Sequence, residues 1–183
     1  MCIIPAVPML LDDELLGLLN RSNAPWARTL LAPYTNSAVL VALGIASALY
    51  VGLRSRSKWV GAMALVVAVV VSDVVAAYAL QPFFERRPPC AAADSRAVAP
   101  EGCPPGHSLP SRQAAAAAAG ALVFSASVPV LSGIAAALAL FIGASRVWLG
   151  QAWPTDVIAG LMLGSAVGAL LLSASRLRFL RWE

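Results

Sequence analysis

The chain has 183 residues, of which 60% are hydrophobic and only 12% are charged, and its formal net charge is +4 at pH 7. With a mean hydropathy of +0.78, this composition excludes an ordinary soluble domain and indicates an integral membrane protein. No run of basic residues is interleaved with aromatic ones, so nucleic acid is not an expected partner, whereas membrane lipids are.

The first 35 residues are expected to form an N-terminal interfacial segment. Residues 1–11 are apolar but contain Pro5 and Pro8 and have no basic start, so they do not predict a cleavable signal peptide. The stretch LLDDELLGLLN, which begins at Leu10, is short and amphipathic. It predicts a helix that lies in the membrane interface or packs on a helical bundle.

Five segments are long and apolar enough to span a hydrocarbon core about 30 Å thick. They lie near residues 37–53, 59–80, 113–128, 130–148 and 156–174. The third segment is rich in alanine, which allows helices to approach closely, and only a short SVPV link joins it to the fourth. The sequence therefore predicts an all-α integral membrane protein. Its single domain, 1–183, would be a bundle of about five transmembrane helices with the N-terminal amphipathic helix.

The positions of basic residues predict how the bundle is oriented. One cluster lies between the first two segments and a second forms a tail at 175–183; their members are Arg54, Arg56, Lys58, Arg176, Arg178 and Arg181. With five spans, both clusters fall on the same side, which is expected to be cytoplasmic. The N-terminus and the connections at 81–112 and 149–155 are then expected outside a bacterial inner membrane.

Two of the three cysteines, Cys90 and Cys103, lie in the 81–112 connection. If this connection faces an oxidising compartment, a disulfide between them can close a short loop. The alternative is a pair of free thiols in a proline-rich loop.

Three polar stretches are expected to converge on the outer face: residues 81–90, 108–113 and 145–156. Each brings guanidinium groups, which belong to Arg86, Arg87, Arg112 and Arg146. With Ser111 and the N–H groups at the start of the third segment, they form a set of donors suited to phosphate. For Arg86 and Arg87 the alternative is contact with lipid headgroups, whereas the apolar sequence beside Arg146 favours a specific role.

These stretches resemble the motifs of the type 2 phosphatidic acid phosphatases, the PAP2 superfamily, which is related to the vanadium haloperoxidases. The family's motifs are Lys-x6-Arg-Pro, Pro-Ser-Gly-His and Ser-Arg-x5-His-x3-Asp, and their order and positions recur over about residues 10–175. The third match is the most specific, because SRVWLG and WPTDVIAG extend beyond the motif positions. The resemblance implies a site for a lipid phosphate. It also implies that a third-motif histidine attacks phosphorus, an aspartate orients it, and a second-motif histidine protonates the leaving group.

In the third motif, Ser145, Arg146 and Asp156 match the family, but Ala152 stands at the position of the nucleophile. A methyl group cannot attack phosphorus, so the family's covalent step has no nucleophile. Asp156 has two interpretations that stay open. It can cap the helix that starts in the PTD stretch, or it can pair with a site arginine.

The first two motifs are changed as well. In the second, Ser111 matches, but Arg112 replaces the glycine and Gln113 replaces the histidine that would protonate the leaving group. Glutamine cannot supply that proton near neutral pH. In the first, Gln81 or Leu80 replaces the lysine, according to the register in which the motif is aligned.

Two further titratable residues remain. His107, the only histidine, lies in a Gly/Pro-rich loop, and we favour a solvated side chain there over a replacement for the missing catalytic groups. Asp73 lies within the second span, so it must face the bundle or find a partner. An outer-face arginine and a simple structural role are both open for it.

The leading hypothesis is a catalytically inactive PAP2-like membrane protein, either an accessory subunit beside other membrane-protein chains or a lipid-phosphate binder. No catalytic residue, metal or cofactor is expected. The vestigial phosphate site would comprise Arg86, Arg87, Ser111, Arg112, Gln113, Arg146 and Asp156. The alternative is an active lipid phosphate or diphosphate phosphatase with unusual catalytic residues, and lipid transport ranks below it.

Overall fold

The structure, a computed structural model, describes residues 10–20, 37–53, 59–92, 95, 97–99 and 102–179, with the backbone alone at 10, 11, 37–40 and 175–179. All regular elements of these residues are helical. In chain order they are α1 (Leu10–Asn20), α3 (Ser37–Leu53), α4 (Trp59–Val74), the π-helix η2 (Val75–Leu80), α5 (Gln81–Phe84), the 3-10 helix η3 (Pro89–Ala91), α6 (Arg112–Ser127), η4 (Pro129–Leu131), α7 (Ser132–Trp148) and α8 (Pro154–Phe179).

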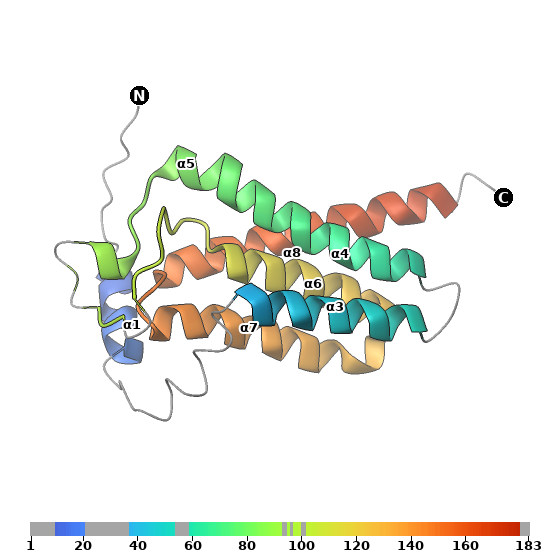
Figure 1. Ribbon diagram of the computed structural model, residues 1–183, viewed down its shortest axis with the longest axis horizontal. Helices are drawn as coiled ribbons and strands as arrows, with labels where there is room; N and C mark the ends of the chain where they lie inside the picture. The colour runs from blue at the N-terminus through green and yellow to red at the C-terminus, as the bar shows by residue number, and fades with distance from the viewer. Residues whose placement is uncertain are drawn as a thin grey trace.

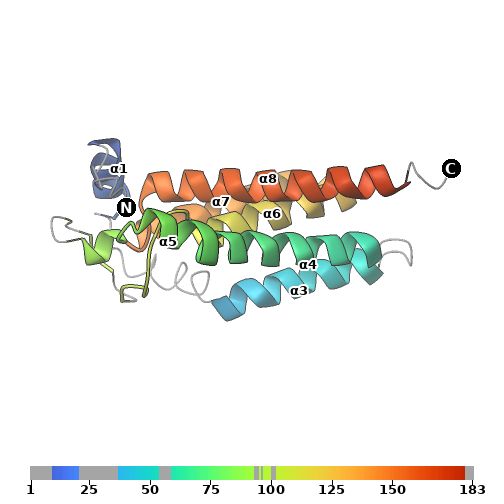
Figure 2. The same cartoon turned by 90° about the horizontal axis from the view of Figure 1, so that it is seen from above.

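Helices α3, α4, α6, α7 and α8 run side by side along the long axis, and α1 lies across one end (Figures 1 and 2). These five helices coincide, within a few residues, with the five predicted segments, so the predicted all-α bundle is confirmed. Helix α6 is central, because it packs against α3, α4, α7 and α8.

Among the described residues, three helical stretches are long and apolar enough to cross a membrane: Trp59–Ala91, Pro129–Trp148 and Pro154–Ala174. Val41–Leu53 adds a shorter apolar helix. The outward faces of the bundle carry large hydrophobic side chains, which water would not favour over such an area. The protein is therefore a membrane protein.

Small residues let α6 and α8 pack backbone to backbone. Gly160, Gly164 and Gly168 lie four residues apart on the face of α8 that meets α6. A Cβ atom on Gly164 would collide with the carbonyl oxygen of Ala115, and one on Gly160 with that of Ser111. The alanine-rich segment thus allows the close helix approach that its composition predicts. We call this backbone contact the α6–α8 seam, and it holds the starts of the two helices against each other.

Two apolar clusters fill the interior. One joins α3, α4 and α6 and includes Val51, Leu65 and Val123. The other lies at the start of α8 and includes Trp153 and Leu16 of α1. Leu16 is 5% exposed, so α1 packs on the bundle, which was one of its two predicted positions.

The two groups of connections lie at opposite ends of the bundle. Helix α3 ends, α4 begins and α8 ends at one end, whereas α1, α5 and the α7–α8 turn lie at the other (Figure 1). This arrangement agrees with the predicted grouping of the connections, while the side of the membrane on which each end lies stays a prediction. The structure does not describe the basic side chains behind that prediction, which belong to Arg54, Arg56, Lys58, Arg176, Arg178 and Arg181.

Candidate functional site

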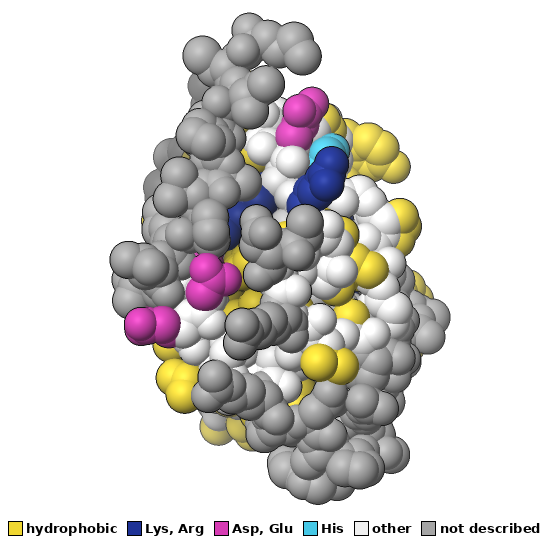
Figure 3. Space-filling view, turned by 90° about the vertical axis from the view of Figure 1, so that its left-hand side faces the viewer, with side chains coloured by type: hydrophobic (Ala, Val, Ile, Leu, Met, Phe, Trp, Pro, Cys, Tyr) yellow, Lys and Arg dark blue, Asp and Glu magenta, His cyan; other side chains and the backbone are white. Residues whose placement is uncertain are grey.

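The three polar stretches meet at the end of the bundle that carries α1. The N–H of Ser111 donates to the carbonyl of Asp156 at 2.9 Å. The N–H of Cys90 donates to the carbonyl of Gly150 at 3.2 Å. Figure 3 looks onto this end, where acidic, basic and histidine side chains reach the surface among apolar ones. The predicted convergence of the stretches is therefore confirmed.

The turn between α7 and α8 is built on backbone hydrogen bonds and one glycine. Gly150 has a φ of +66°, a left-handed conformation that favours glycine. The N–H groups of Gln151 and Ala152 both donate to the carbonyl of Arg146, at 2.9 and 3.2 Å. Ala152 is 3% exposed and packs in the cluster that contains Leu16. The methyl group at the nucleophile's position is therefore part of the apolar core.

Asp156 has both of the roles that the sequence left open. Its Oδ2 accepts the N–H of Trp153 at 3.1 Å, which closes the first turn of α8. Its Oδ1 lies 2.7 Å from Nη1 of Arg86 in an ion pair. The carboxylate is fully buried, so both oxygens are held by protein donors.

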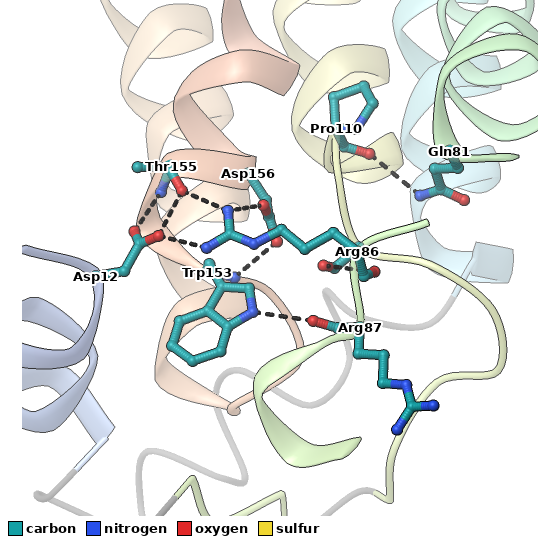
Figure 4. A network of polar contacts seen from close by, with 9 residues as sticks. Asp12, Gln81, Arg86, Arg87, Pro110, Trp153, Thr155 and Asp156 are labelled. Carbon is teal, nitrogen blue, oxygen red and sulfur yellow. Dashed lines mark hydrogen bonds and ion pairs between the residues drawn. The ribbon is translucent and has the colours of Figure 1, made fainter. Parts of the chain in front are cut away.

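Arg86 and Arg87, which the sequence treats alike, point in different directions (Figure 4). Arg86 reaches inward and also donates to Thr155 Oγ1 at 2.7 Å, with its guanidinium carbon 5.2 Å from the ring centre of Trp153. Arg87 is exposed, and its backbone carbonyl accepts the indole N–H of Trp153 at 3.0 Å. Arg86 therefore holds the site together, whereas the side chain of Arg87 faces away from it.

Asp12 of α1, which was not among the predicted site residues, completes this network (Figure 4). Its Oδ2 lies 2.5 Å from Nη2 of Arg86 and accepts the hydroxyl of Thr155 at 2.7 Å. Its Oδ1 accepts the N–H of Thr155 at 3.0 Å. A usable signal was present, because Asp12, Leu16 and Asn20 are four residues apart and share one face of a helix. All three are buried.

Arg112 does not join this network. It forms a bidentate ion pair with Asp73, with distances of 2.9 and 2.7 Å, and both side chains are partly exposed. Of the two roles left open for Asp73, the pair shows a contact with an arginine at the end of the bundle that carries α1, and it turns the Arg112 guanidinium toward α4. Arg112, expected in the anion cluster, is committed to a carboxylate instead.

The other replaced positions lie near the start of α6. The side-chain amide of Gln81 donates to the carbonyl of Pro110 at 3.1 Å. Of the two candidates for the family's lysine position, Gln81 is therefore the one that contacts the second motif. Gln113 is half-buried in the first turn of α6, and His107 is exposed.

Among the arginines whose side chains the structure describes, Arg146 is distinct because it is buried without an anion. It is 6% exposed, and its Nε has no acceptor. None of the ion pairs formed by the described residues includes it. The Oγ of Ser111 and the Oε1 of Gln151 are also buried without a hydrogen-bond partner.

Ser111 and Arg146 are brought to the same level of the bundle by helix packing. A Cβ atom on Gly143 of α7 would lie 3.9 Å from that of Ala114 on α6. Arg146 and Ser111 each lie three residues from this contact, in both cases toward the end that carries α1. About one helical turn separates them from it, so both donors belong to the same region.

A disulfide joins Cys90 to Cys103, with 5.7 Å between the Cα atoms. The predicted pairing is therefore present, and it closes the loop that contacts Gly150. In the part of the chain that the structure describes, no group of three His, Cys, Asp or Glu side chains is placed to hold a metal ion.

Comparisons with known proteins agree with the fold. The sequence profile of the PAP2 superfamily matches residues 61–179. A search of curated protein sequences found no significant match. Among solved structures, LpxE from Aquifex aeolicus is similar, with a TM-score of 0.75 and 24% identity, over 94% of this chain and 99% of that one.

A second similar structure is the first transmembrane PAP2-type phosphatidylglycerolphosphate phosphatase from Bacillus subtilis. Its TM-score is 0.74 at 21% identity, and the match covers 95% of this chain and 89% of that one. At these identities, both similarities establish a shared fold.

Proposed function

We propose a binding function for this chain, which belongs to the PAP2 superfamily. It holds the phosphate group of a membrane lipid at Arg146 and does not hydrolyse it. The observation that carries this proposal is the guanidinium of Arg146, which is buried without a carboxylate partner among the described residues.

A buried cation without a counter-ion is unfavourable, because its desolvation is not offset by a Coulombic partner. A phosphate supplies that partner, since guanidinium groups bind phosphate oxygens through charge-assisted hydrogen bonds. The unpartnered hydroxyl of Ser111 and the N-terminus of α6 offer further donors in the same region. The group that suits this set of donors is a phosphate monoester.

Three features argue against turnover. The nucleophile's position is a core methyl group, Ala152, and the leaving-group acid is replaced by Gln113. The carboxylate that would orient a nucleophile, Asp156, is occupied by Arg86 and by a backbone N–H. Nucleophile, acid and orienting group act together in such reactions, so the loss of the first two, with the third held by other partners, removes most of the acceleration.

The lipid character of the ligand is supported by the fold and by its neighbours. The chain is a membrane protein whose three polar stretches meet at one end of the bundle, where a headgroup can reach them. One similar structure is named as a phosphatase of phosphatidylglycerolphosphate, a phospholipid phosphate. We place this end of the bundle outside a bacterial inner membrane, in accord with the basic residues at the other end.

Lipid retention by the purified protein tests the proposal. We expect phosphatidic acid to remain bound to the wild-type chain, as measured by mass spectrometry after exchange into phosphatidylcholine nanodiscs. Arg146→Gln should lower retention about tenfold or more, because a charge-assisted interaction is lost. Arg87→Gln, the same change at an exposed arginine, should leave retention unchanged.

A phosphate-release assay on the same samples distinguishes binding from turnover. We expect no release above the protein-free background. Release that Arg146→Gln abolishes would show an active enzyme and overturn the proposal. Equal retention by wild type and Arg146→Gln would mean that Arg146 does not hold the lipid phosphate, which would also contradict the proposal. Membrane proteins that co-purify with the wild-type chain would identify the partners of an accessory subunit.

A further inference from the structure

Helix α1 is attached to the site at three points on one face. Asp12 is bonded to Thr155 at the start of α8. Leu16 packs in the cluster of Ala152 and Trp153. The side-chain amide of Asn20 donates to the carbonyl of Trp148 at 2.7 Å, at the end of α7. Helix α1 therefore bridges the turn between α7 and α8. It contacts the end of α7, the turn itself and the start of α8.

The carboxylate of Asp12 occupies a place that suits an oxyanion. Its donors are the N–H of Thr155 in the first turn of α8, the hydroxyl of the same residue and the guanidinium of Arg86. A helix N-terminus, a hydroxyl and an arginine are the groups that bind phosphate oxygens in proteins. The chain's own carboxylate fills this set of donors.

Two groups of charges lie around the α7–α8 turn, and neither is balanced on its own. One is Asp12, Asp156 and Arg86, and the other is Arg146. Asp12 and Asp156 are both fully buried and share one guanidinium. With both carboxylates ionised, this group carries one excess negative charge. Arg146 carries one unpaired positive charge. Two consecutive backbone amides connect Arg146 with the Asp156 carboxylate. The N–H of Ala152 donates to the carbonyl of Arg146, and the N–H of Trp153 donates to the carboxylate of Asp156.

We propose that α1 is a strap that closes the phosphate site, with Asp12 as an internal substitute for a ligand oxyanion. This inference rests on the proposed function at Arg146. A phosphate monoester brings a charge of about −1.5 to −2, which repels the excess negative charge at Asp12 where the dielectric is low. Phosphate binding and docking of α1 therefore oppose each other, and release of Asp12 frees Arg86 and Thr155 for the ligand.

The sequence of α1 suits a detachable element. An isolated helix of 11 residues has little stability of its own, so its position depends on the three contacts. Its outward face exposes Leu15 and Leu18, at 43% and 69%, beside the acidic residues Asp13 and Glu14. Once released, an amphipathic helix of this kind can lie in the membrane interface.

Binding measurements on two matched variants test the strap. Asp12→Asn removes the internal anion, and Asp13→Asn makes the same change on the exposed neighbour. We expect Asp12→Asn to bind phosphatidic acid in phosphatidylcholine nanodiscs about fivefold more tightly than wild type or more, and Asp13→Asn to bind as wild type does. Inorganic phosphate, added to nanodiscs without phosphatidic acid, shows whether the free anion is enough to give the same order of affinities.

Cysteine labelling measures the position of α1 directly. In a Cys2→Ser background, Leu16→Cys should react slowly with a maleimide, and faster when phosphatidic acid is present or when Asp12→Asn is added. Leu18→Cys, already exposed, should react at one rate throughout. Faster labelling caused by Asp12→Asn alone shows that the Asp12 carboxylate holds α1 in place, whether or not a ligand binds.

The outcomes separate the two proposals. Binding that depends on Arg146 but is equal in wild type and Asp12→Asn, with labelling of Leu16→Cys unchanged, would overturn the strap and leave the proposed function standing. Absence of binding in wild type that Asp12→Asn restores would support the strap as a closed state. Absence of binding in both would overturn both.

Discussion

Asp156 uses its two carboxylate oxygens for different partners, one for the start of α8 and one for Arg86. In the family that the sequence resembles, this aspartate orients a histidine. An imidazole at position 152 would have to share this carboxylate with Arg86 and with the N–H of Trp153. Restoring the lost histidines therefore does not by itself restore the arrangement that they need.

We expect the double substitution Ala152→His with Gln113→His to release no phosphate from phosphatidic acid above background. The imidazole at 152 also enters a packed cluster with Leu16 and Trp153, so the unfolding free energy should fall by about 1–3 kcal/mol. Phosphate release and thermal unfolding check the two parts. Gln113→His alone, at a half-buried position, is the control, and Arg146-dependent release by the double variant would contradict the expectation.

The sequence predicted some of the side-chain pairs in the site but not others. The disulfide and the Asp73–Arg112 pair follow from residue types in segments that the sequence already brings together. Arg86 and Arg87 are chemically identical neighbours, and only the backbone direction after α5 decides which one turns inward. Asp12 lies 143 residues from Thr155 along the chain, and no local pattern encodes so distant a partner.

At the scale of elements, the five main helices were predictable because hydropathy alone marks their lengths and limits. Close packing between these helices was predictable, but the residues that form the contacts were not. The alanine run indicates a close approach, but the glycines of α8 that meet it follow from the relative rotation of two helices, which a single sequence does not give.

The α6–α8 seam gives a sharp prediction. Gly164→Ala places a methyl group against the carbonyl of Ala115, so we expect a loss of about 1–3 kcal/mol in unfolding free energy and a lower midpoint in thermal unfolding. Gly44→Ala, in α3, meets nothing within 4 Å and should be neutral or slightly stabilising, because alanine favours a helix. Equal effects of the two substitutions would mean that α6 and α8 are not in backbone contact.

For the molecule as a whole, the disulfide attaches the long connection between α5 and α6 to the site. It closes a loop with a sequence separation of 13 residues, so its removal should lower stability by about 3 kcal/mol through the entropy of the unfolded chain. We expect Cys90→Ala with Cys103→Ala to unfold at a lower temperature than Cys2→Ser, which keeps the bond. If reductant leaves the unfolding temperature of Cys2→Ser unchanged, the bond does not stabilise the fold.

The backbone contact between α6 and α8 also determines where the site can move. Two helices in such contact shift as one rigid body, and Ser111 is bonded to Asp156 at the end of that body. The part of the site that they form is therefore preorganised, since its ordering entropy is lost during folding and not during binding. Slow hydrogen exchange at the amide of Ser111 beside fast exchange in α1 would be the sign of a fixed receptor under a movable cover.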